Sequence, residues 1–227
     1  MLFTTTCTWS LLLIGIQSVA AGHQAPKSRR DVQADIPSNI KIVLGKPELI
    51  VSADRRSIDL GVHIGQRGSL PILPRALTAN QTDALNLHNK ARAKKKIKAL
   101  VWDSKLEKDA KAWAVKLAKS GKLEHSTSED RPNQGENLAY VSSSQPISAP
   151  MSIGTKGCHL SSRLAEIKDY HNEIIPKGNF SDYGHYTQCM WNTTLKIGIA
   201  TASNGKGAWF TVARYSPPGN YVGRRPY

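Results

Sequence analysis

The sequence is short of acidic residues, of cysteine and of long apolar runs, and each shortage limits what the chain can be. Its 17 aspartates and glutamates are outnumbered by 31 lysines and arginines, which gives a formal net charge of +14. A chain with this charge is attracted to any acidic surface, so charge alone names no partner. No apolar segment reaches the roughly 18 residues that span a bilayer, so a membrane-spanning helix is not expected. At 227 residues the chain suits one folded domain with an extension.

Only three cysteines are present, and one lies in a stretch typical of a secretory signal peptide. An apolar run over residues 9–16 precedes small residues that fit a cleavage site. We therefore predict a signal peptide over residues 1–21 and a mature protein that is secreted to the extracellular space. Cleavage removes Cys7 and leaves Cys158 and Cys189, which we expect to be disulfide bonded in an oxidising compartment.

Residues 22–77 are predicted to be a prosegment or a disordered linker. Their five prolines interrupt any long helix. The dibasic pair Arg55-Arg56 is typical of a processing site, and a solvated linker explains it equally well. Apolar patches at residues 40–44 and 49–51 are candidates for short strands or for a cover over the edge of the domain.

Two helices are predicted from their end signals. Thr78 and Gln81 form a capping box at the start of the first helix. Ser104 and Glu107 form a second capping box, which opens a helix with apolar residues at helical spacing, and Gly121 is suited to end it.

The C-terminal part changes from a helical to an alternating pattern. A third helix is expected near residues 161–175, and two strands are expected over 196–202 and 208–215. An Asn-Gly step between the strands is typical of an antiparallel hairpin. Helices around a small antiparallel sheet predict an α+β sandwich domain, which we place at residues 78–227.

The candidate site centres on residues 184–191, where imidazole, phenol, hydroxyl, carboxamide and indole groups lie within eight residues. His185 in this segment, with His125, Glu136 and Glu166 upstream, forms the predicted site. Two neutral imidazoles with nearby carboxylates can hold Zn²⁺ or another divalent metal, directly or through water. The same four groups can instead form a self-neutralising buried polar network. The residue types leave both interpretations open.

Several motifs occur in an order that resembles the CAP superfamily of cysteine-rich secretory, antigen 5 and pathogenesis-related proteins. The resemblance covers residues 78–223. The motifs are His88-Asn89-x-x-Arg92, Leu100-x-Trp102, His125-Ser126, Gly135-Glu136-Asn137-Leu138, Glu166-x-x-x-Tyr170, Gly184-His185-Tyr186-Thr187-Gln188-x-x-Trp191 and Tyr215-x-Pro217-x-Gly219-Asn220. Within this superfamily the chain resembles the secreted, pathogenesis-related-like fungal members.

The resemblance implies a three-layer α-β-α sandwich with a shallow cavity lined by His125, Glu136, Glu166 and His185. It associates a divalent metal with the two histidines, and the glutamates would then lie behind them as hydrogen-bond partners. Sterol or small-lipid binding is also known in such proteins. The loop over residues 174–183 is the candidate lipid contact, through Ile174, Ile175, Phe180 and Tyr183.

Three functions follow from these patterns. The first is a non-catalytic secreted protein that binds a sterol or other small lipid, and a divalent metal in the cavity. The second is a secreted effector or allergen-like protein that acts through its surface without carrying a ligand. The third is a metal-assisted hydrolase or protease, for which Ser126 and Thr187 are the nearest hydroxyls but show no activating arrangement in the sequence.

The sequence also contains a cluster of basic residues and three glycosylation sequons. A basic run could dock on an anionic membrane or glycan, or could be the solvated end of a helix; it contains Lys90, Arg92, Lys94, Lys95, Lys96 and Lys98. It lacks interleaved aromatic residues, so nucleic acid is not an expected partner. Three N-x-S/T sequons predict N-linked glycans; they begin at Asn80, Asn179 and Asn192.

Overall fold

The computed structural model describes residues 40–51, 75–148, 150–154 and 166–227. The predicted signal peptide over 1–21 and the dibasic pair at 55–56 lie outside the described residues, as does Cys158. None of the helices in the described part of the chain is long and apolar enough to cross a membrane.

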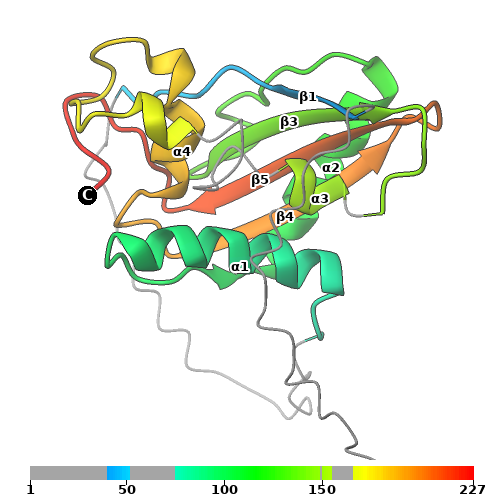
Figure 1. Cartoon of the computed structure of the whole chain (residues 1–227), viewed down its shortest axis with the longest axis horizontal. Helices are drawn as coiled ribbons and strands as arrows, with labels where there is room; N and C mark the ends of the chain where they lie inside the picture. The colour runs from blue at the N-terminus through cyan, green and yellow to red at the C-terminus, as the bar shows by residue number, and fades with distance from the viewer. Residues whose placement is uncertain (1–39, 52–74, 149, 155–165) are drawn as a thin grey trace, which may run out of the picture. The chain divides into compact units, whose positions relative to one another are not determined.

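The described strands form one five-stranded sheet in the order β1-β3-β5-β4-β2 (Figure 1). The strands are β1 (Ile40–Leu44), β2 (Val101–Trp102), β3 (Gly135–Ser143), β4 (Lys196–Ser203) and β5 (Ala208–Ser216). The pairs β1–β3, β3–β5 and β4–β5 are antiparallel, and only the short β2 pairs in parallel, with β4. The long central pair β3–β5 places Glu136 opposite Arg214.

Helices cover both faces of this sheet, so the fold is the predicted three-layer α-β-α sandwich (Figure 1). The helices α1 (Ala79–Lys94), α3 (Pro150–Gly154) and α4 (Gly184–Cys189) share one hydrophobic core with the sheet. Helix α2 (Ser104–Ser120) packs in a second core against β3, β4 and β5. Two short 3₁₀ helices, Glu166–Asp169 and Phe180–Asp182, precede α4.

Strands β4 and β5 contribute to both cores because successive side chains point to opposite faces. Ile197, Ile199 and Tyr215 are buried on the side of α1 and α4. Ala200 and Phe210 are buried on the side of α2. The alternation in the sequence therefore corresponds to two cores rather than to one buried and one solvated face.

The start of α1 agrees with the sequence, and the start of α2 does not. Thr78 and Gln81 form the predicted capping box, with Thr78 N donating to Gln81 Oε1 at 3.0 Å. Helix α2 is capped instead by Asp103, whose carboxylate accepts from the backbone N–H of Lys105 at 2.9 Å and of Leu106 at 3.0 Å. A carboxylate at the N-cap is a strong hydrogen-bond acceptor, and its negative charge is attracted to the positive N-terminal end of the helix dipole. The predicted capping box at Ser104 is therefore wrong by one residue.

The C-terminal end of α2 and the hairpin are confirmed. Gly121 adopts a φ of 72° and closes the helix by donating to Leu117 O at 2.8 Å. The β4–β5 turn contains Asn204, whose Oδ1 accepts from the backbone of Lys206 at 2.8 Å and of Ala208 at 3.2 Å.

The third predicted helix is mostly outside the described residues, and its described part is short. Residues 166–169 form a single 3₁₀ turn, and no helix continues through 170–175. Asn172 has a φ of 68°, which is outside the helical region, so the backbone here is that of a loop.

Part of the segment upstream of the domain is a component of the sheet. Residues 40–44, one of the two apolar patches, form β1 and pair with β3 along its outer edge. Residues 45–50, which we call the strap, continue from β1 across the end of β3 toward the C-terminal tail. Ile50 makes a parallel bridge with Tyr221 there.

Candidate functional site

His125 is held between a carboxylate and a backbone carbonyl. It lies in the loop after α2, with its Nδ1 2.6 Å from Glu136 Oε1 and its Nε2 2.5 Å from the carbonyl oxygen of Lys46. Both partners are acceptors, so both ring nitrogens must carry a proton in this arrangement. Burial by itself lowers the pKa of His125, but the hydrogen bond and the charge of Glu136 outweigh it and raise that pKa above its ordinary value.

Glu136, on β3, is saturated with donors although it is 1% exposed. Its Oε1 also accepts from the backbone N–H of Ser126 at 3.0 Å, and its Oε2 accepts from the Ser126 hydroxyl at 3.0 Å and pairs with Arg214 Nη2 at 2.8 Å. Burial tends to raise the pKa of Glu136, but the hydrogen bond from His125 and the charge of Arg214 hold it below its usual range. The carboxylate is therefore fixed in its charged form.

His185 forms the second histidine–carboxylate pair. It is the second residue of α4, and its Nδ1 lies 2.7 Å from Glu166 Oε1. The other carboxylate oxygen, Oε2, accepts from the backbone N–H of Tyr186 at 2.8 Å. Glu166 thus satisfies one of the unpaired backbone donors at the start of α4 and fixes the plane of the imidazole at the same time.

The outer nitrogen of His185 is buried and, within the described part of the chain, has no hydrogen-bond partner. Because Nδ1 donates to Glu166, the neutral form of this ring places a bare lone pair on Nε2. A buried acceptor without a donor is costly, which makes Nε2 the atom of the site best suited to bind a ligand.

One hydrogen bond links the strand that carries Glu136 to the helix that carries His185. Asn137, next to Glu136 on β3, donates to the backbone carbonyl of His185 at 3.1 Å. Among the described residues, no three His, Cys, Asp or Glu side chains are grouped closely enough to hold one metal ion. The two glutamates face the Nδ1 atoms, so these two histidines could hold a metal only through their Nε2 atoms, and His125 Nε2 would first have to leave the Lys46 carbonyl.

Residues of the strap complete the site; the apolar patches predicted a cover over the edge of the domain, but not contact with His125 or Arg131. The strap supplies the carbonyl of Lys46 to His125, and Glu48 forms an ion pair with Arg131. Burial raises the pKa of Glu48 above its usual value, with the charges of Arg131 and His125 opposing that rise.

Arg214 is the site residue that the sequence could have revealed. It occupies a core-facing position of β5, in line with Phe210 and Val212. A charged residue at a buried position needs a partner, and here that partner is Glu136 across the β3–β5 pair.

The hydroxyl groups near the histidines are tied to other partners. Ser126 Oγ donates to Glu136 and accepts from Arg214 Nη2 at 3.0 Å, and Thr187 Oγ1 lies 2.7 Å from Asn220 Oδ1 and 3.1 Å from Gly184 O. An activated nucleophile needs its hydroxyl on a general base such as an imidazole. Neither hydroxyl is bonded to an imidazole, and the carboxylate that accepts from Ser126 is already saturated with other donors.

A second buried cluster lies behind α4. The hydroxyl of Tyr215 lies 3.0 Å from His88 Nε2, 3.3 Å from Asn137 Nδ2 and 3.4 Å from Cys189 Sγ. Cys189 is disulfide-bonded, and Cys158, its predicted partner, lies outside the described residues.

The predicted lipid loop is partly used in the core. Ile175 and Tyr183 are each 1% exposed and pack in the core of α1 and α4. Ile174 and Phe180 are half-buried, and the Phe180 ring meets that of Tyr183 edge-on at 5.5 Å. The surface that a lipid could contact from this loop is therefore limited to Ile174 and Phe180.

The basic run covers the C-terminal end of α1 and the residues after it, and one of its members is not on the surface. Arg92 is fully buried and donates to the carbonyl oxygens of Lys98, Cys189, Trp191 and Thr194. It holds α1 against the segment after α4, so it cannot take part in docking. The five lysines are exposed; they are Lys90, Lys94, Lys95, Lys96 and Lys98.

The sequons differ in exposure. Asn179 and Asn192 lie on exposed loops, whereas Asn80 is half-buried in the first turn of α1. Glycosylation stays a prediction at all three.

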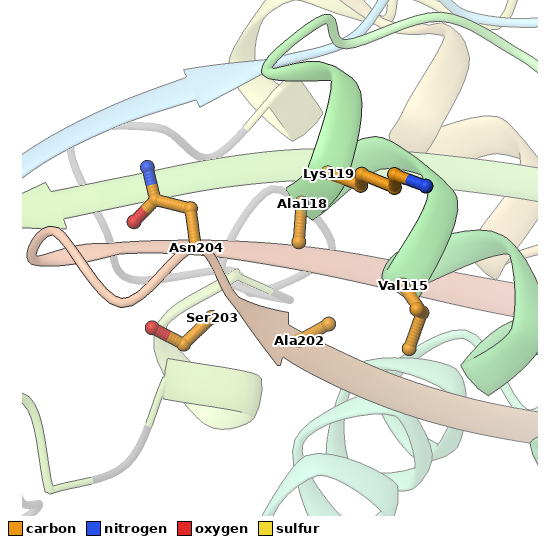
Figure 2. A pocket seen from close by; sticks show the side chains of 6 residues that line it. All are labelled: Val115, Ala118, Lys119, Ala202, Ser203 and Asn204. Atoms are coloured by element: carbon orange, nitrogen blue, oxygen red, sulfur yellow. The ribbon is translucent and has the colours of Figure 1, made fainter.

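A shallow pocket lies away from the histidines, between the C-terminal half of α2 and the end of β4 (Figure 2). Its lining consists of Val115, Ala118, Lys119, Ala202, Ser203 and Asn204. These residues supply one cation and no carboxylate or imidazole, so this pocket does not share the chemistry of the histidine site.

The chain is similar in sequence to known secretory and pathogenesis-related proteins. The model of the cysteine-rich secretory protein (CAP) family matches residues 85–215. A PR-1 type pathogenesis-related protein of Sambucus nigra is 34% identical over 151 residues, which cover 64% of this chain and 80% of that protein. A probable pathogenesis-related protein of the fungus Arthroderma benhamiae is 33% identical over 60% of this chain and 44% of its own length.

A solved structure is similar over the same domain. The crystal structure of NaASP2 with Zn²⁺ is 26% identical, has a TM-score of 0.52, and is matched over 64% of this chain and 83% of that chain. The similarity supports the three-layer sandwich.

Proposed function

The chain belongs to the cysteine-rich secretory protein (CAP) family, and we propose that it is a secreted binding protein that holds a zinc ion between His125 and His185. The observation that carries this proposal is the buried Nε2 of His185, which has no hydrogen-bond partner in the described part of the chain. The zinc-containing crystal structure of the similar protein NaASP2 supports the choice of metal.

The residues present fit a zinc ion in their chemistry. Each imidazole is oriented by a carboxylate on Nδ1, at 2.6 Å for His125 and 2.7 Å for His185. Such a carboxylate fixes the ring and makes Nε2 a better ligand. Zinc accepts imidazole nitrogen, and two histidines leave coordination positions for water or a ligand oxygen. A bound zinc ion would supply an electrophilic centre for such a ligand.

Zinc uptake by the full chain tests the proposal. We expect calorimetry at neutral pH to show one zinc site per chain in the wild type and none in His185→Ala. Uptake should fall as the pH drops, because zinc binds only the neutral imidazole, and the raised pKa of His125 places this loss at a higher pH than for an ordinary histidine near 6.5.

The matched control is His171→Ala, which removes an exposed histidine from the same chain and should leave zinc uptake unchanged. Circular dichroism should show the same helix content in all three proteins, because the cores do not depend on the imidazole. Equal zinc uptake by the wild type and His185→Ala would refute the site and leave the two pairs as a buried polar network.

Lipid carriage is the second function that the family suggests for this chain. Its support is the half-buried pair Ile174 and Phe180 on the loop before α4. Native mass spectrometry of the secreted protein should detect a sterol or small lipid as added mass if the chain carries one. A chain that leaves the cell without such mass supports the interaction role of an effector or allergen-like protein.

A further inference from the structure

The strap lies on the histidine site as a bound peptide would. Its N-terminal end is fixed by Gly45 N, which donates to Leu138 O at 2.9 Å as a continuation of the β1–β3 ladder. At its other end, Ile50 N donates to Asn220 O at 3.0 Å and Ile50 O accepts from Val222 N at 2.9 Å. Both anchors are β-type pairings, and between them the chain passes His125 and Gly184.

The middle of the strap is also held through its main chain. The Lys46 carbonyl accepts from His125 Nε2 at 2.5 Å, and the Glu48 carbonyl accepts from Asn220 Nδ2 at 3.0 Å. Hydrogen bonds to the main chain do not depend on side-chain identity. Here the donors are the side chains of His125 and Asn220, and the peptide groups they hold would be offered by almost any bound peptide, as in the binding of an added peptide strand.

Two side chains of the strap fit features that select for them. Pro47 packs on Gly184, where an added Cβ would lie 2.2 Å from the Pro47 Cβ, so the site is shaped for close approach at this point. Glu48 pairs with Arg131, which is 6% exposed and whose other N–H groups donate to Ser126 O at 3.2 Å and Gln134 O at 2.9 Å. A buried guanidinium without a carboxylate would be strongly disfavoured, so this position selects an acidic residue.

We propose that the histidine site is a binding groove for an extended peptide in which proline is followed by an acidic residue, and that the strap is the chain's own occupant of this groove. Because it is tethered, the strap occupies the groove at an effective concentration of about millimolar. An external peptide therefore binds in the groove only when the strap has dissociated from it. In one respect the inference rests on the proposed function: zinc and the strap compete, because His125 Nε2 cannot both donate to Lys46 and bind a metal.

The first experiment asks whether Glu48 holds the strap, and it uses the full chain. In Glu48→Arg, we expect hydrogen exchange of the Ile50 and Val222 amides to be at least about tenfold faster than in the wild type, because like charges meet at Arg131. The matched control is Lys46→Gln, which changes an exposed side chain of the strap and keeps its carbonyl; exchange should stay as in the wild type.

The second experiment measures peptide binding in metal-free buffer, so that the outcome of the zinc proposal cannot affect it. A fluorescein-labelled peptide with the sequence of residues 40–51 should bind Glu48→Arg at least about tenfold more tightly than it binds the wild type or Lys46→Gln. The same peptide with glutamine in place of Glu48 should bind Glu48→Arg about tenfold more weakly.

Glu48→Gln, which removes the charge without adding bulk, is the second variant. It should bind the labelled peptide more tightly than the wild type does, but by a smaller factor than Glu48→Arg. If the labelled peptide binds both variants no more tightly than it binds the wild type, the groove is not a peptide site and the proposal is overturned. If the glutamine peptide binds as well as the parent peptide, the selection for an acidic residue is overturned.

Discussion

At the scale of single residues, Glu136 is the group on which the site depends most. Its carboxylate neutralises buried Arg214 and accepts from His125 and Ser126. Glu136→Gln leaves the guanidinium buried without its counter-charge, so we expect the free energy of unfolding to fall by about 3–5 kcal/mol. Urea denaturation at neutral pH measures this loss. Glu129→Gln, at an exposed position, is the control and should unfold at the same urea concentration as the wild type.

The pH dependence of the same variant gives a second check. The pKa of Glu136 is lower in the folded protein than in the unfolded chain, so its contribution to stability is present above the unfolded pKa and is lost as the pH falls through the folded pKa. Wild-type stability should therefore decline on acidification more steeply than that of Glu136→Gln. Parallel acid profiles for the two proteins would contradict the assigned ion pair.

At the scale of helices and strands, patterns within one element were predictable and contacts between elements were not. The capping box at Thr78 and the β4–β5 hairpin depend on residues a few positions apart, and both were predicted. The Asp103 cap was missed because two neighbouring residues could each begin α2. The burial of Arg92 was missed because its carbonyl partners lie up to 102 positions away in the chain.

The contribution of the strap was missed for the same reason. The sequence marked residues 40–44 as a candidate strand, but their pairing with β3 joins residues about a hundred positions apart. The four polar residues of the site could be named from motifs. The partner of each Nδ1, and the carbonyl on His125, required the three-dimensional arrangement.

The lysines at the end of α1 form an exposed cationic surface. We expect binding to vesicles with anionic lipid to fall steeply from about 0.05 M to about 0.5 M salt, because screening weakens charge attraction. Replacing four exposed lysines by glutamine should weaken binding at low salt; the four are Lys94, Lys95, Lys96 and Lys98. Sedimentation with vesicles measures both effects.

The control for this surface removes the same charge from α2. It replaces four other exposed lysines by glutamine: Lys108, Lys111, Lys116 and Lys119. If both quadruple variants lose binding equally, the attraction comes from net charge and not from the end of α1.

At the scale of the whole molecule, the disulfide bond of Cys189 fixes the end of the helix that carries His185. If its partner is Cys158, nonreducing peptide mapping should recover the two segments as one linked species. Cys158→Ser should lower the melting temperature, because the closed loop of about 30 residues contributes roughly 3–4 kcal/mol. Cys7→Ser is the control, since signal cleavage would remove that residue. Two free thiols in the secreted protein would contradict the pairing.

All six residues of α4 are buried, from Gly184 to Cys189. Selection for folding alone would therefore preserve this hexapeptide through evolution about as strictly as selection for a ligand would. Pro47 restricts the position of Gly184 by its close approach, and Asn220 restricts that of Thr187 by a hydrogen bond to its hydroxyl, and both contacts serve structure. The atom at which the two kinds of selection separate is Nε2 of His185, since a side chain of similar volume could fill its space without offering a lone pair there. Natural variation at that position, more than the persistence of the surrounding motif, should report which members of the family have kept a ligand.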